Sequence, residues 1–420
     1  MEKAILIHLA TDKQEKSKAK ESMKELNGLA RTAGADVIQE VFQFRADISP
    51  KFLIGEGKVE ELEALKDKLL ADLFIFDHNL TPIQQKSLED ELQCKVIDRT
   101  QLILDIFAQR ARSREGKLQV ELAQLNYLLP RLLGKGQALS RLGGGIGTRG
   151  PGEKKLEEDR RRIKERISKI KLDIGKIQKR RSHQRKNRQR APTPVVSLVG
   201  YTNAGKSTLF NLLSQETMAT SSQLFSTLDP IIRRVYFQDG LYFLLSDTVG
   251  FIKKLPIELI TAFRATLEEV KEADCVCHVI DITSSSYLSQ IETVEKILAD
   301  LGVNDIPILK IFNKMDLVPD RNELLEKSTK PNSQVAFISA KTKEGIPQLK
   351  EKLRSILFKD LRIFYLRIPK ENKDMIRSFP KWSIVLKKRE NRDSFELKIM
   401  ADPNLMLHFL PYIKQGDPNW

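Results

Sequence analysis

Apolar and polar residues alternate along this chain in several distinct rhythms, and each rhythm predicts a different kind of structure. Through about residue 110, short apolar runs alternate with charged segments of helical period. The runs occupy residues 4–9, 37–44, 73–76 and 95–97. Such an alternation of strands and helices is typical of an α/β layer structure. We therefore predict a small N-terminal α/β domain over residues 1–112.

A pair of helical stripes follows in residues 113–192. Apolar residues recur there at spacings of three, four or seven positions, which places them on one face of a helix. The first stripe is Leu118, Leu122, Leu125, Leu129 and Leu132, and the second is Leu156, Ile163, Ile167, Ile170, Ile174 and Ile177. We predict two antiparallel helices, a helical hairpin, packed along these stripes.

The connection between the two stripes is long and rich in glycine. Residues 134–152 contain eight glycines together with Lys135, Arg141 and Arg149. A turn between helices needs only a few residues. Because glycine lets backbone approach a ligand closely and the arginine fork matches phosphate oxygens, we predict that this loop binds RNA through the three basic residues. A disordered loop is the alternative.

Residues 193–360 contain short, continuous apolar runs, which are typical of buried strands in a mainly parallel sheet. The runs occupy residues 195–199, 241–246, 308–312 and 335–338. Pro192 and Pro194 mark the start of this domain. Beyond it, a strand, helix, strand, strand, helix order predicts a small α+β C-terminal domain over residues 361–420.

The first of these runs leads into a phosphate-binding pattern. Residues 200–207, GYTNAGKS, match GxxxxGK[ST] between a predicted strand and a predicted helix. In this pattern backbone N–H groups surround the phosphates, Lys206 reaches the β and γ oxygens, and the Ser207 hydroxyl binds Mg²⁺. The second run ends in Asp247, which can hold Mg²⁺ through its water shell, and Gly250, whose N–H can meet the γ-phosphate.

The last two runs end in segments that suit a guanine base. The first is Asn313-Lys314-Met315-Asp316, and the Asp316 carboxylate can accept two hydrogen bonds from guanine N1–H and its 2-amino group. Adenine offers no such pair. Lys314 would lie over the base, Asn313 would tie its loop to the phosphate loop, and the backbone of residues 339–341 would meet guanine O6. The sequence therefore predicts a GTP and GDP site.

These four segments, in this order, resemble the translation-factor-class GTPases over about residues 194–358. Two rarer segments narrow the resemblance, RLGGGIGTRGPGE at 141–153 and FSTLDP at 225–230. With them the chain resembles the HflX family over essentially its whole length. The resemblance implies a GTPase that binds the large ribosomal subunit and its rRNA, and that dissociates stalled ribosomes or acts in subunit recycling or biogenesis.

The resemblance also assigns roles to single residues. It makes Thr227 a Mg²⁺ ligand beside Ser207 and Asp247, and it makes Lys206, Thr227 and Gly250 the catalytic set. The residues expected to contact the nucleotide are Gly200, Tyr201, Thr202, Asn203, Ala204, Gly205, Lys206, Ser207, Thr208, Phe225, Ser226, Thr227, Leu228, Asp229, Asp247, Thr248, Val249, Gly250, Asn313, Lys314, Met315, Asp316, Ser339, Ala340 and Lys341.

Two positions bear on the rate of hydrolysis. Many small GTPases place a glutamine directly after DxxG to orient the attacking water, and here that position is Phe251. A phenyl ring cannot orient water, so we expect slow hydrolysis that the ribosome stimulates. Asn203 raises a further hypothesis, since its amide oxygen could help hold a K⁺ ion beside the phosphates. A loop-stabilising asparagine is the alternative.

Charge agrees with an anionic partner. Lys and Arg total 71 against 56 Asp and Glu, a formal net charge of +15. Residues 111–190 hold 24 basic and 8 acidic residues, whereas the rest of the chain holds 47 and 48. The excess therefore belongs to the helical hairpin, and phosphate contacts are expected there.

Composition excludes several other classes. Cys94, Cys275 and Cys277 cannot form a disulfide framework, and no cysteine or histidine spacing suits zinc. No apolar run is long enough to span a membrane. We expect a cytoplasmic monomer, with peripheral membrane association left open. Two rival functions also stay open: an RNA-binding assembly module stabilised by nucleotide, and a membrane-surface regulator.

Overall fold

The computed structural model describes residues 1–11, 16–132, 151–188, 193–215, 225, 231–238, 241–248, 250–252, 270–303, 305–319, 334–359, 361–372, 375–376, 384–401 and 403–414. The chain forms two compact units, one mainly of residues 1–177 and the other mainly of residues 178–420. The predicted multidomain α/β class, with a mainly parallel sheet in the second unit, is confirmed.

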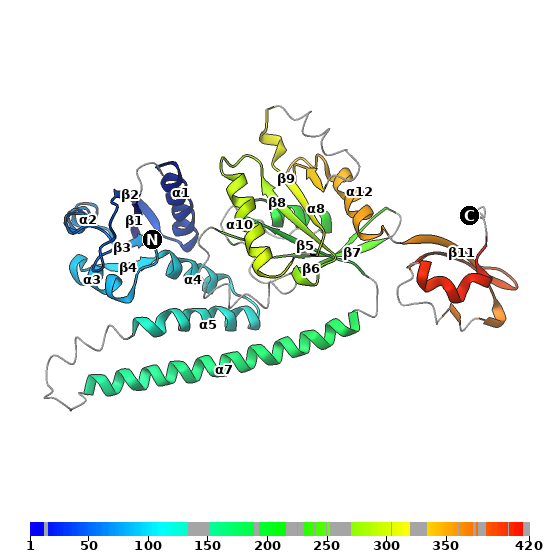
Figure 1. The fold of residues 1–420 in the computed structure, drawn as a ribbon, viewed down its shortest axis with the longest axis horizontal. Coiled ribbons are helices and arrows are strands. Elements are labelled where there is room, and N and C mark those ends of the chain that lie inside the picture. Colours follow the sequence, from blue (N-terminus) through cyan, green and yellow to red (C-terminus); the bar gives the residue numbers. More distant parts are fainter. Residues whose placement is uncertain are drawn as a thin grey trace. The chain divides into compact units, whose positions relative to one another are not determined.

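The N-terminal domain is a parallel sheet covered by helices on both faces (Figure 1). Its strands lie in the order β2-β1-β3-β4. The elements are β1 (Lys3–Ala10), α1 (Lys16–Ala33), β2 (Asp36–Phe44), α2 (Glu56–Leu69), β3 (Leu73–Phe76), α3 (Pro82–Leu92), β4 (Lys95–Asp98) and α4 (Arg99–Arg110). Buried residues of α2 and α3 form one core with the strands, and α1 and α4 pack together against the sheet. The predicted strand positions are therefore confirmed.

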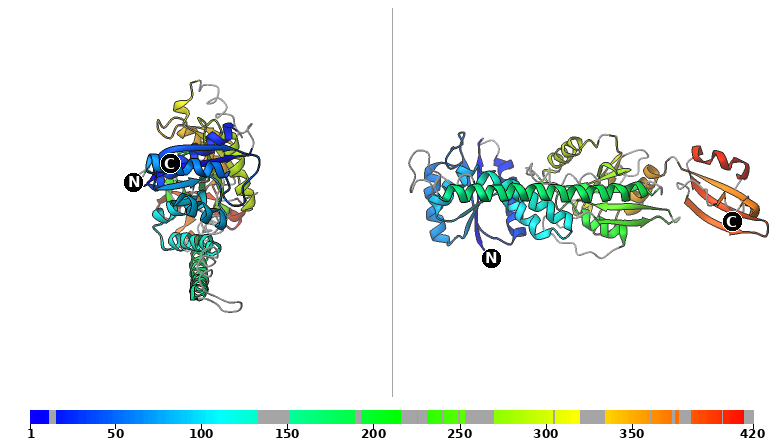
Figure 2. Two further views of the ribbon diagram at one scale, coloured as in Figure 1. Left: turned by 90° about the vertical axis from the view of Figure 1, so that its left-hand side faces the viewer. Right: turned by 90° about the horizontal axis from the view of Figure 1, so that it is seen from below.

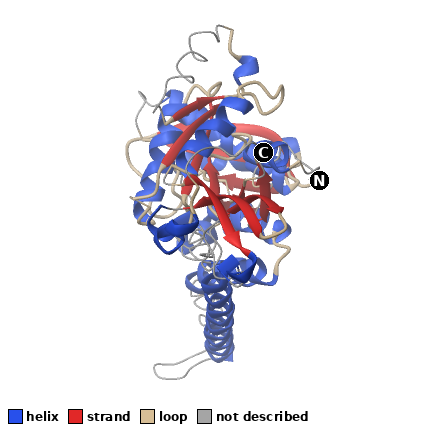
Figure 3. Cartoon of the chain, turned by 90° about the vertical axis from the view of Figure 1, so that its right-hand side faces the viewer, coloured by secondary structure: helices blue, strands red, loops and turns tan. Residues whose placement is uncertain are grey.

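The two predicted stripes meet in a helical hairpin. It consists of α5 (Arg114–Arg131) and α7 (Pro151–Arg188), which lie side by side in two views (Figures 1 and 2). The shared core contains Leu122, Ile167 and Ile170, with Leu118, Leu125, Leu129, Ile163 and Ile174 packed around it. Arg166 of α7 makes a two-pronged ion pair to Glu121 of α5, at 2.6 and 2.8 Å. Figure 3 shows both helices in blue.

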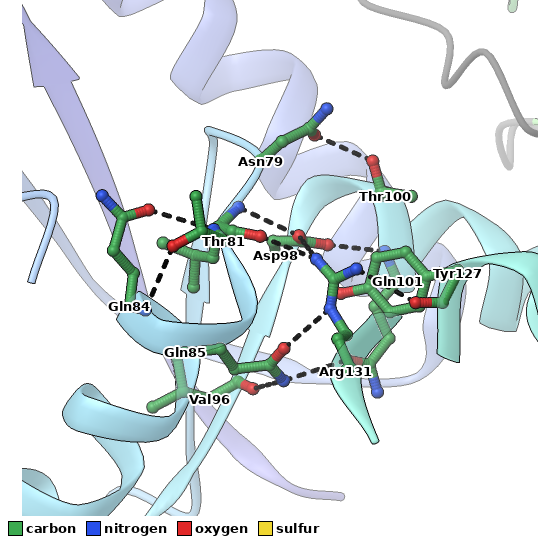
Figure 4. A network of polar contacts seen from close by, with 11 residues as sticks. Asn79, Thr81, Gln84, Gln85, Val96, Asp98, Thr100, Gln101, Tyr127 and Arg131 are labelled. Atoms are coloured by element: carbon green, nitrogen blue, oxygen red, sulfur yellow. Dashed lines mark hydrogen bonds and ion pairs between the residues drawn. The ribbon is translucent and has the colours of Figure 1, made fainter. Parts of the chain in front are cut away.

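The end of α5 is tied to the N-terminal sheet by a polar network (Figure 4). Arg131 donates from Nη2 to the carbonyl of Leu80 at 2.7 Å and to Asp98 Oδ2 at 3.1 Å, and from Nε to Gln85 Oε1 at 3.0 Å. Its guanidinium also lies 3.4 Å from the centroid of the Tyr127 ring. Asp98 is fully buried, so this arginine neutralises a carboxylate that water does not reach.

The second unit contains a six-stranded sheet in the order β10-β9-β8-β5-β7-β6. All pairs are parallel except β6–β7. Its elements are β5 (Val195–Gly200), α8 (Lys206–Ser214), β6 (Ile231–Tyr236), β7 (Tyr242–Asp247), β8 (Cys275–Asp281), α10 (Tyr287–Asp300), β9 (Ile308–Asn313), the 3₁₀ helix η2 (Met315–Leu317), β10 (Val335–Phe337) and α12 (Ile346–Leu357). Cys275 and Cys277 are buried in its core, as a packing role requires.

A three-stranded antiparallel sheet in the order β11-β13-β12 forms the C-terminal domain. Its elements are β11 (Arg362–Pro369), η3 (Lys370–Asn372), β12 (Ile384–Glu390), β13 (Ser394–Ala401) and the 3₁₀ helix η4 (Pro403–Tyr412). The core under η4 is apolar and consists of Leu366, Ile368, Leu397, Ile399, Ala401, Met406 and Phe409. The domain boundaries at residues 112, 192 and 360 stay predictions.

Candidate functional site

The phosphate loop leaves the carboxyl end of β5 through two conformations that favour glycine. Gly200 has φ +147°, and a Cβ there would lie 2.2 Å from the Val279 carbonyl oxygen. Gly205 has φ +94°, and a Cβ there would lie 2.2 Å from Asn313 Nδ2. Any other residue at either position would therefore strain the loop. Helix α8 begins directly afterwards at Lys206, so its N-terminal N–H groups face the loop.

Lys206 lies inside this loop and is almost fully buried. Its ammonium donates to the carbonyl oxygens of Gly200 at 3.1 Å and Tyr201 at 2.8 Å. Burial lowers the pKa of Lys206 to about 8, and the nearby Asp247 carboxylate opposes the shift. A buried cation bonded to neutral carbonyls is suited to exchange these partners for phosphate oxygens.

Ser207 and Asp247 place oxygen donors beside the lysine. The Ser207 hydroxyl donates to Asp247 Oδ2 at 2.9 Å, and Asp247 is 2% exposed. A hydroxyl and a carboxylate at the end of β7 are hard oxygen ligands of the type that Mg²⁺ prefers. The two residues therefore fit a Mg²⁺ ion shared with nucleotide phosphates.

The DxxG segment is held against the phosphate loop by backbone hydrogen bonds. The N–H of Thr202 donates to the Phe251 carbonyl at 2.8 Å, and the N–H of Phe251 donates to the Gly200 carbonyl at 3.0 Å. Gly250 lies so close that a Cβ would be 2.9 Å from Thr202 Cγ2 and 3.0 Å from Lys206 Nζ. Phe251 is 2% exposed and packs in the core. Its ring is therefore unavailable to orient water.

The predicted base-reading loops also meet at this edge of the sheet. Asn313 donates from Nδ2 to the Ala204 carbonyl at 2.9 Å, and its Oδ1 accepts from the Ala340 N–H at 2.9 Å. Asn313 thus links the phosphate loop to the loop after β10. The Ser339 hydroxyl donates to Asp316 Oδ1 at 2.7 Å and holds the carboxylate in place.

Asp281 is a residue of this site that the sequence analysis missed. Its carboxylate forms a 2.6 Å ion pair with Lys314 Nζ. Because the pair fixes the long lysine side chain, it sets where the aliphatic stem can lie beside a base. The available signal was its position at the carboxyl end of β8, between two strands whose ends carry recognised motifs.

Several predicted site residues lie outside the described residues. They are Ser226, Thr227, Leu228, Asp229 and Val249, and the basic residues Lys135, Arg141 and Arg149. Phe225 is described, and it is 2% exposed with its ring centroid 4.5 Å from that of Phe107. Its side chain therefore packs within the first unit.

Curated relatives match nearly the whole chain. A GTPase HflX of Caldanaerobacter subterraneus subsp. tengcongensis is 48% identical over 370 residues, which cover 88% of this chain and 84% of that protein. The GTPase HflX of Escherichia coli K12 is 42% identical over 368 residues, covering 88% and 86%. The chain belongs to the HflX family of GTPases.

Family models match three consecutive parts of the chain. The matches are "GTP-binding GTPase N-terminal" at residues 20–108, "GTP-binding GTPase Middle Region" at 110–188 and "50S ribosome-binding GTPase" at 195–314. As a member of this family the protein binds GTP and hydrolyses it to GDP and phosphate, with the Mg²⁺ that GTPase domains in general require.

The chain is also similar to solved structures of proteins in complex with GDP. A structure described as SsGBP in complex with GDP is 27% identical, covers 85% of this chain and 98% of that chain, and has a TM-score of 0.50. A GTP-binding protein from Sulfolobus solfataricus with GDP is 26% identical, covers 85% and 99%, and has a TM-score of 0.47. Within the described residues, no helix combines the length and apolar character that crossing a bilayer demands.

Proposed function

We propose that this HflX-family GTPase binds the large ribosomal subunit in its GTP state and releases it after hydrolysis, and that its task is the dissociation of stalled ribosomes. Three features support the proposal: the family membership, the ribosome-binding description of the domain at residues 195–314, and the basic hairpin. Lysine and arginine side chains exposed on α7 suit contacts to rRNA phosphates.

The main observation in support of a difference between the GTP and GDP states is the close contact between Gly250 and the phosphate loop. The Gly250 backbone lies where a side chain would collide with Thr202 and Lys206. A γ-phosphate held by Lys206 would therefore be within reach of the Gly250 N–H, whereas GDP would leave that N–H without this partner. The presence of one phosphate thus decides whether the DxxG segment is held.

Ser207 and Asp247 would hold Mg²⁺, with Thr227 as a further ligand in the GTP state. The ion would supply positive charge to the β- and γ-phosphate oxygens. Lys206 would supply a second positive charge once its bonds to the Gly200 and Tyr201 carbonyls exchange for phosphate. The Asp316 carboxylate would read guanine, because Ser339 already holds one of its oxygens in a fixed orientation.

Hydrolysis by the isolated protein is proposed to be slow. Phe251 is buried in the core, so the attacking water must be oriented by a backbone group, by another side chain or by the bound ribosome. Adding purified large subunits should raise the GTP hydrolysis rate at least tenfold, whereas small subunits should change it little. Equal rates with both subunits would contradict the proposal.

A K⁺ ion beside Asn203 is proposed as an additional source of charge. Asn203 is exposed at the mouth of the phosphate loop and has φ +62°. Its amide oxygen would be one ligand of the ion. Hydrolysis measured in K⁺ and in Na⁺ at equal ionic strength tests this, with the Asn203→Ala variant as the control. Faster hydrolysis in K⁺ that the variant loses supports the site, and equal rates refute it.

The Gly-rich connection is proposed to dock on rRNA through Lys135, Arg141 and Arg149. Replacing Arg141 and Arg149 together with Glu should weaken binding to large subunits while nucleotide affinity stays within about twofold. Unchanged subunit binding would refute this assignment.

A further inference from the structure

The C-terminal sheet has one face buried under η4. On its other face, Met400 and Ile384 pack against the core of the second unit, and the rows of residues beyond them form an open face. Alternate residues of β11 and β13 point into the core under η4, and the residues between them point to the other side. Strand register groups the open face into rows across the sheet. One row is Tyr365, Lys398 and Lys387, and the next is Arg367, Glu396 and Arg389. This face is therefore mainly basic, with an aromatic ring among its cations.

The ring and the cations lie close together. Lys398 Nζ is 5.2 Å from the centroid of the half-buried Tyr365 ring. Lys414 reaches the same face and lies 3.4 Å from Glu396 Oε1, so the one acidic group in these rows already has a cation beside it. Arg367, Lys387 and Arg389 are exposed. The net charge of the rows is strongly positive.

The register itself opposes stability. Lys387 and Lys398 lie directly opposite one another on neighbouring strands, and like charges in such cross-strand positions destabilise a sheet. A bound polyanion would remove that repulsion. The charge of the chain outside residues 111–190, which is close to neutral, does not reveal this basic face. Residues 361–420 alone hold 12 basic and 7 acidic residues.

We propose that this open face binds single-stranded RNA, with a base stacked on Tyr365 and phosphates contacted by Lys387, Lys398 and Arg389. Aromatic rings on a sheet, surrounded by Lys and Arg, accept unpaired bases by stacking and the backbone by charge. A bilayer surface would need several bulky apolar side chains that protrude, whereas Ile363 is exposed beside these rows and the Tyr365 ring is half-buried among cations. The inference deepens the proposed function, because it assigns a second RNA contact outside the hairpin.

The test uses the full chain and a fluorescently labelled 12-nucleotide oligouridine RNA. Lys387→Glu and Lys388→Glu form a matched pair, because the residues are adjacent while Lys388 lies on the η4 side with its Nζ 4.9 Å from the Phe395 ring. Lys387→Glu should weaken RNA binding at least fivefold, and Lys388→Glu less than twofold. Equal losses would show that only net charge matters and would overturn the proposal.

Stacking is tested at Tyr365. Tyr365→Ala should weaken RNA binding several-fold, and Tyr365→Phe should restore it because the ring alone is needed. Equal affinities for all three proteins would overturn the proposal. Cross-links from 4-thiouridine RNA should map to β11, β12 or β13 in addition to α7, and cross-links confined to α7 would also overturn it. So would binding to anionic lipid vesicles that depends on Lys387 while RNA binding does not.

The outcome is separable from that of the proposed function. The short RNA is bound without nucleotide, whereas the ribosome proposal requires a difference between GTP and GDP. If Lys387→Glu does not weaken RNA binding while subunit binding still differs between GTP and GDP, only the RNA-binding face is overturned. If Lys387→Glu weakens RNA binding while subunit binding is the same in GTP and GDP, only the switch is overturned.

Discussion

Both parallel sheets of this protein end in polar clusters at the carboxyl edges of their strands, yet the two clusters are partnered differently. In the N-terminal domain, Asp77 follows β3 and accepts from Arg99 Nη1 at 2.7 Å and from Ser22 Oγ at 2.6 Å. In the second unit, the cation at the corresponding edge is Lys206, and its hydrogen bonds within the described residues go to neutral carbonyls.

The difference separates a structural network from a ligand site. Arg99 is 1% exposed between Asp77 and Glu25, so opposite charges from the chain itself already fill that edge. His8, Asp77 and His78 are spaced within 4.8 Å as metal ligands could be, but Arg99 already supplies the cation there. At the nucleotide site Asp247 lies near Lys206, but the hydrogen bonds of the ammonium go to neutral carbonyls, so a phosphate can take their place. The carboxyl edge of a parallel sheet is thus suited to bind an anionic ligand where its cation is hydrogen-bonded to carbonyls and not to carboxylates.

The largest expected effect is a loss of folding stability when Arg99 is removed from its ion pairs with Asp77 and Glu25. Arg99→Met would leave Asp77 and Glu25 without their cation, and removal of one partner of a buried ion pair costs about 3–5 kcal/mol. Urea unfolding followed by circular dichroism should show that loss in the N-terminal transition. Arg161→Ala removes an exposed pair with Glu165 and serves as the control, with an expected cost of about 0.5 kcal/mol or less. Equal costs would contradict the comparison.

A smaller loss is expected from the network in Figure 4. Arg131→Met removes the cation from Asp98, whose carboxylate would still accept from the N–H groups of Leu80 and Gln101. The expected cost is about 1–3 kcal/mol, since those two bonds remain. Hydrogen exchange should rise at the end of α5. Exchange unchanged there would show that Arg131 does not hold the helix.

The nucleotide site should respond in specificity rather than in stability. Asp316→Asn places an amide donor where guanine presents its 2-amino donor, so GTP affinity should fall at least tenfold, which is about 1.4 kcal/mol. Affinity for xanthosine triphosphate, which carries a carbonyl at that position, should rise. The exposed Asp300→Asn variant should change neither value. Unchanged GTP affinity would refute Asp316 as the base reader.

The smallest effect is a proton linkage at Lys206. Burial lowers its pKa to about 8 in the free protein, and bound phosphate should keep the ammonium protonated. Nucleotide binding should then take up about half a proton at pH 8 and almost none at pH 6.5. Affinity should fall as pH rises through this pKa. Calorimetry in two buffers of different ionisation enthalpy measures the uptake, and none at pH 8 would contradict it.

The nucleotide site could be predicted from sequence because its chemistry restricts residue types at fixed spacings. Gly200, Gly205 and Lys206 each meet a local requirement of phosphate binding, so a single segment reveals them. The strands of the N-terminal sheet and four strands of the second sheet followed from short apolar runs, whereas β6 (Ile231–Tyr236), which carries Arg233 and Arg234, did not. These features depend on neighbours in the chain, which a sequence displays directly.

The features that were missed depend on partners far apart in the chain. Arg131 and Asp98 are 33 residues apart and match no pattern, and Asp281 and Lys314 are likewise 33 apart. Charge counted by segment concealed the C-terminal face, because sheet register determines that Lys387 and Lys398 lie together. Tertiary pairing of this kind has no local signature.

The central claim, that one phosphate switches ribosome binding, is tested most directly by sedimenting the protein with purified large subunits in GDP and in a non-hydrolysable GTP analogue. The account predicts that the analogue increases the co-sedimenting fraction at least tenfold, and that the Gly250→Ala variant abolishes the increase because its Cβ would collide with Thr202 and Lys206. Identical co-sedimentation in both nucleotides would contradict it.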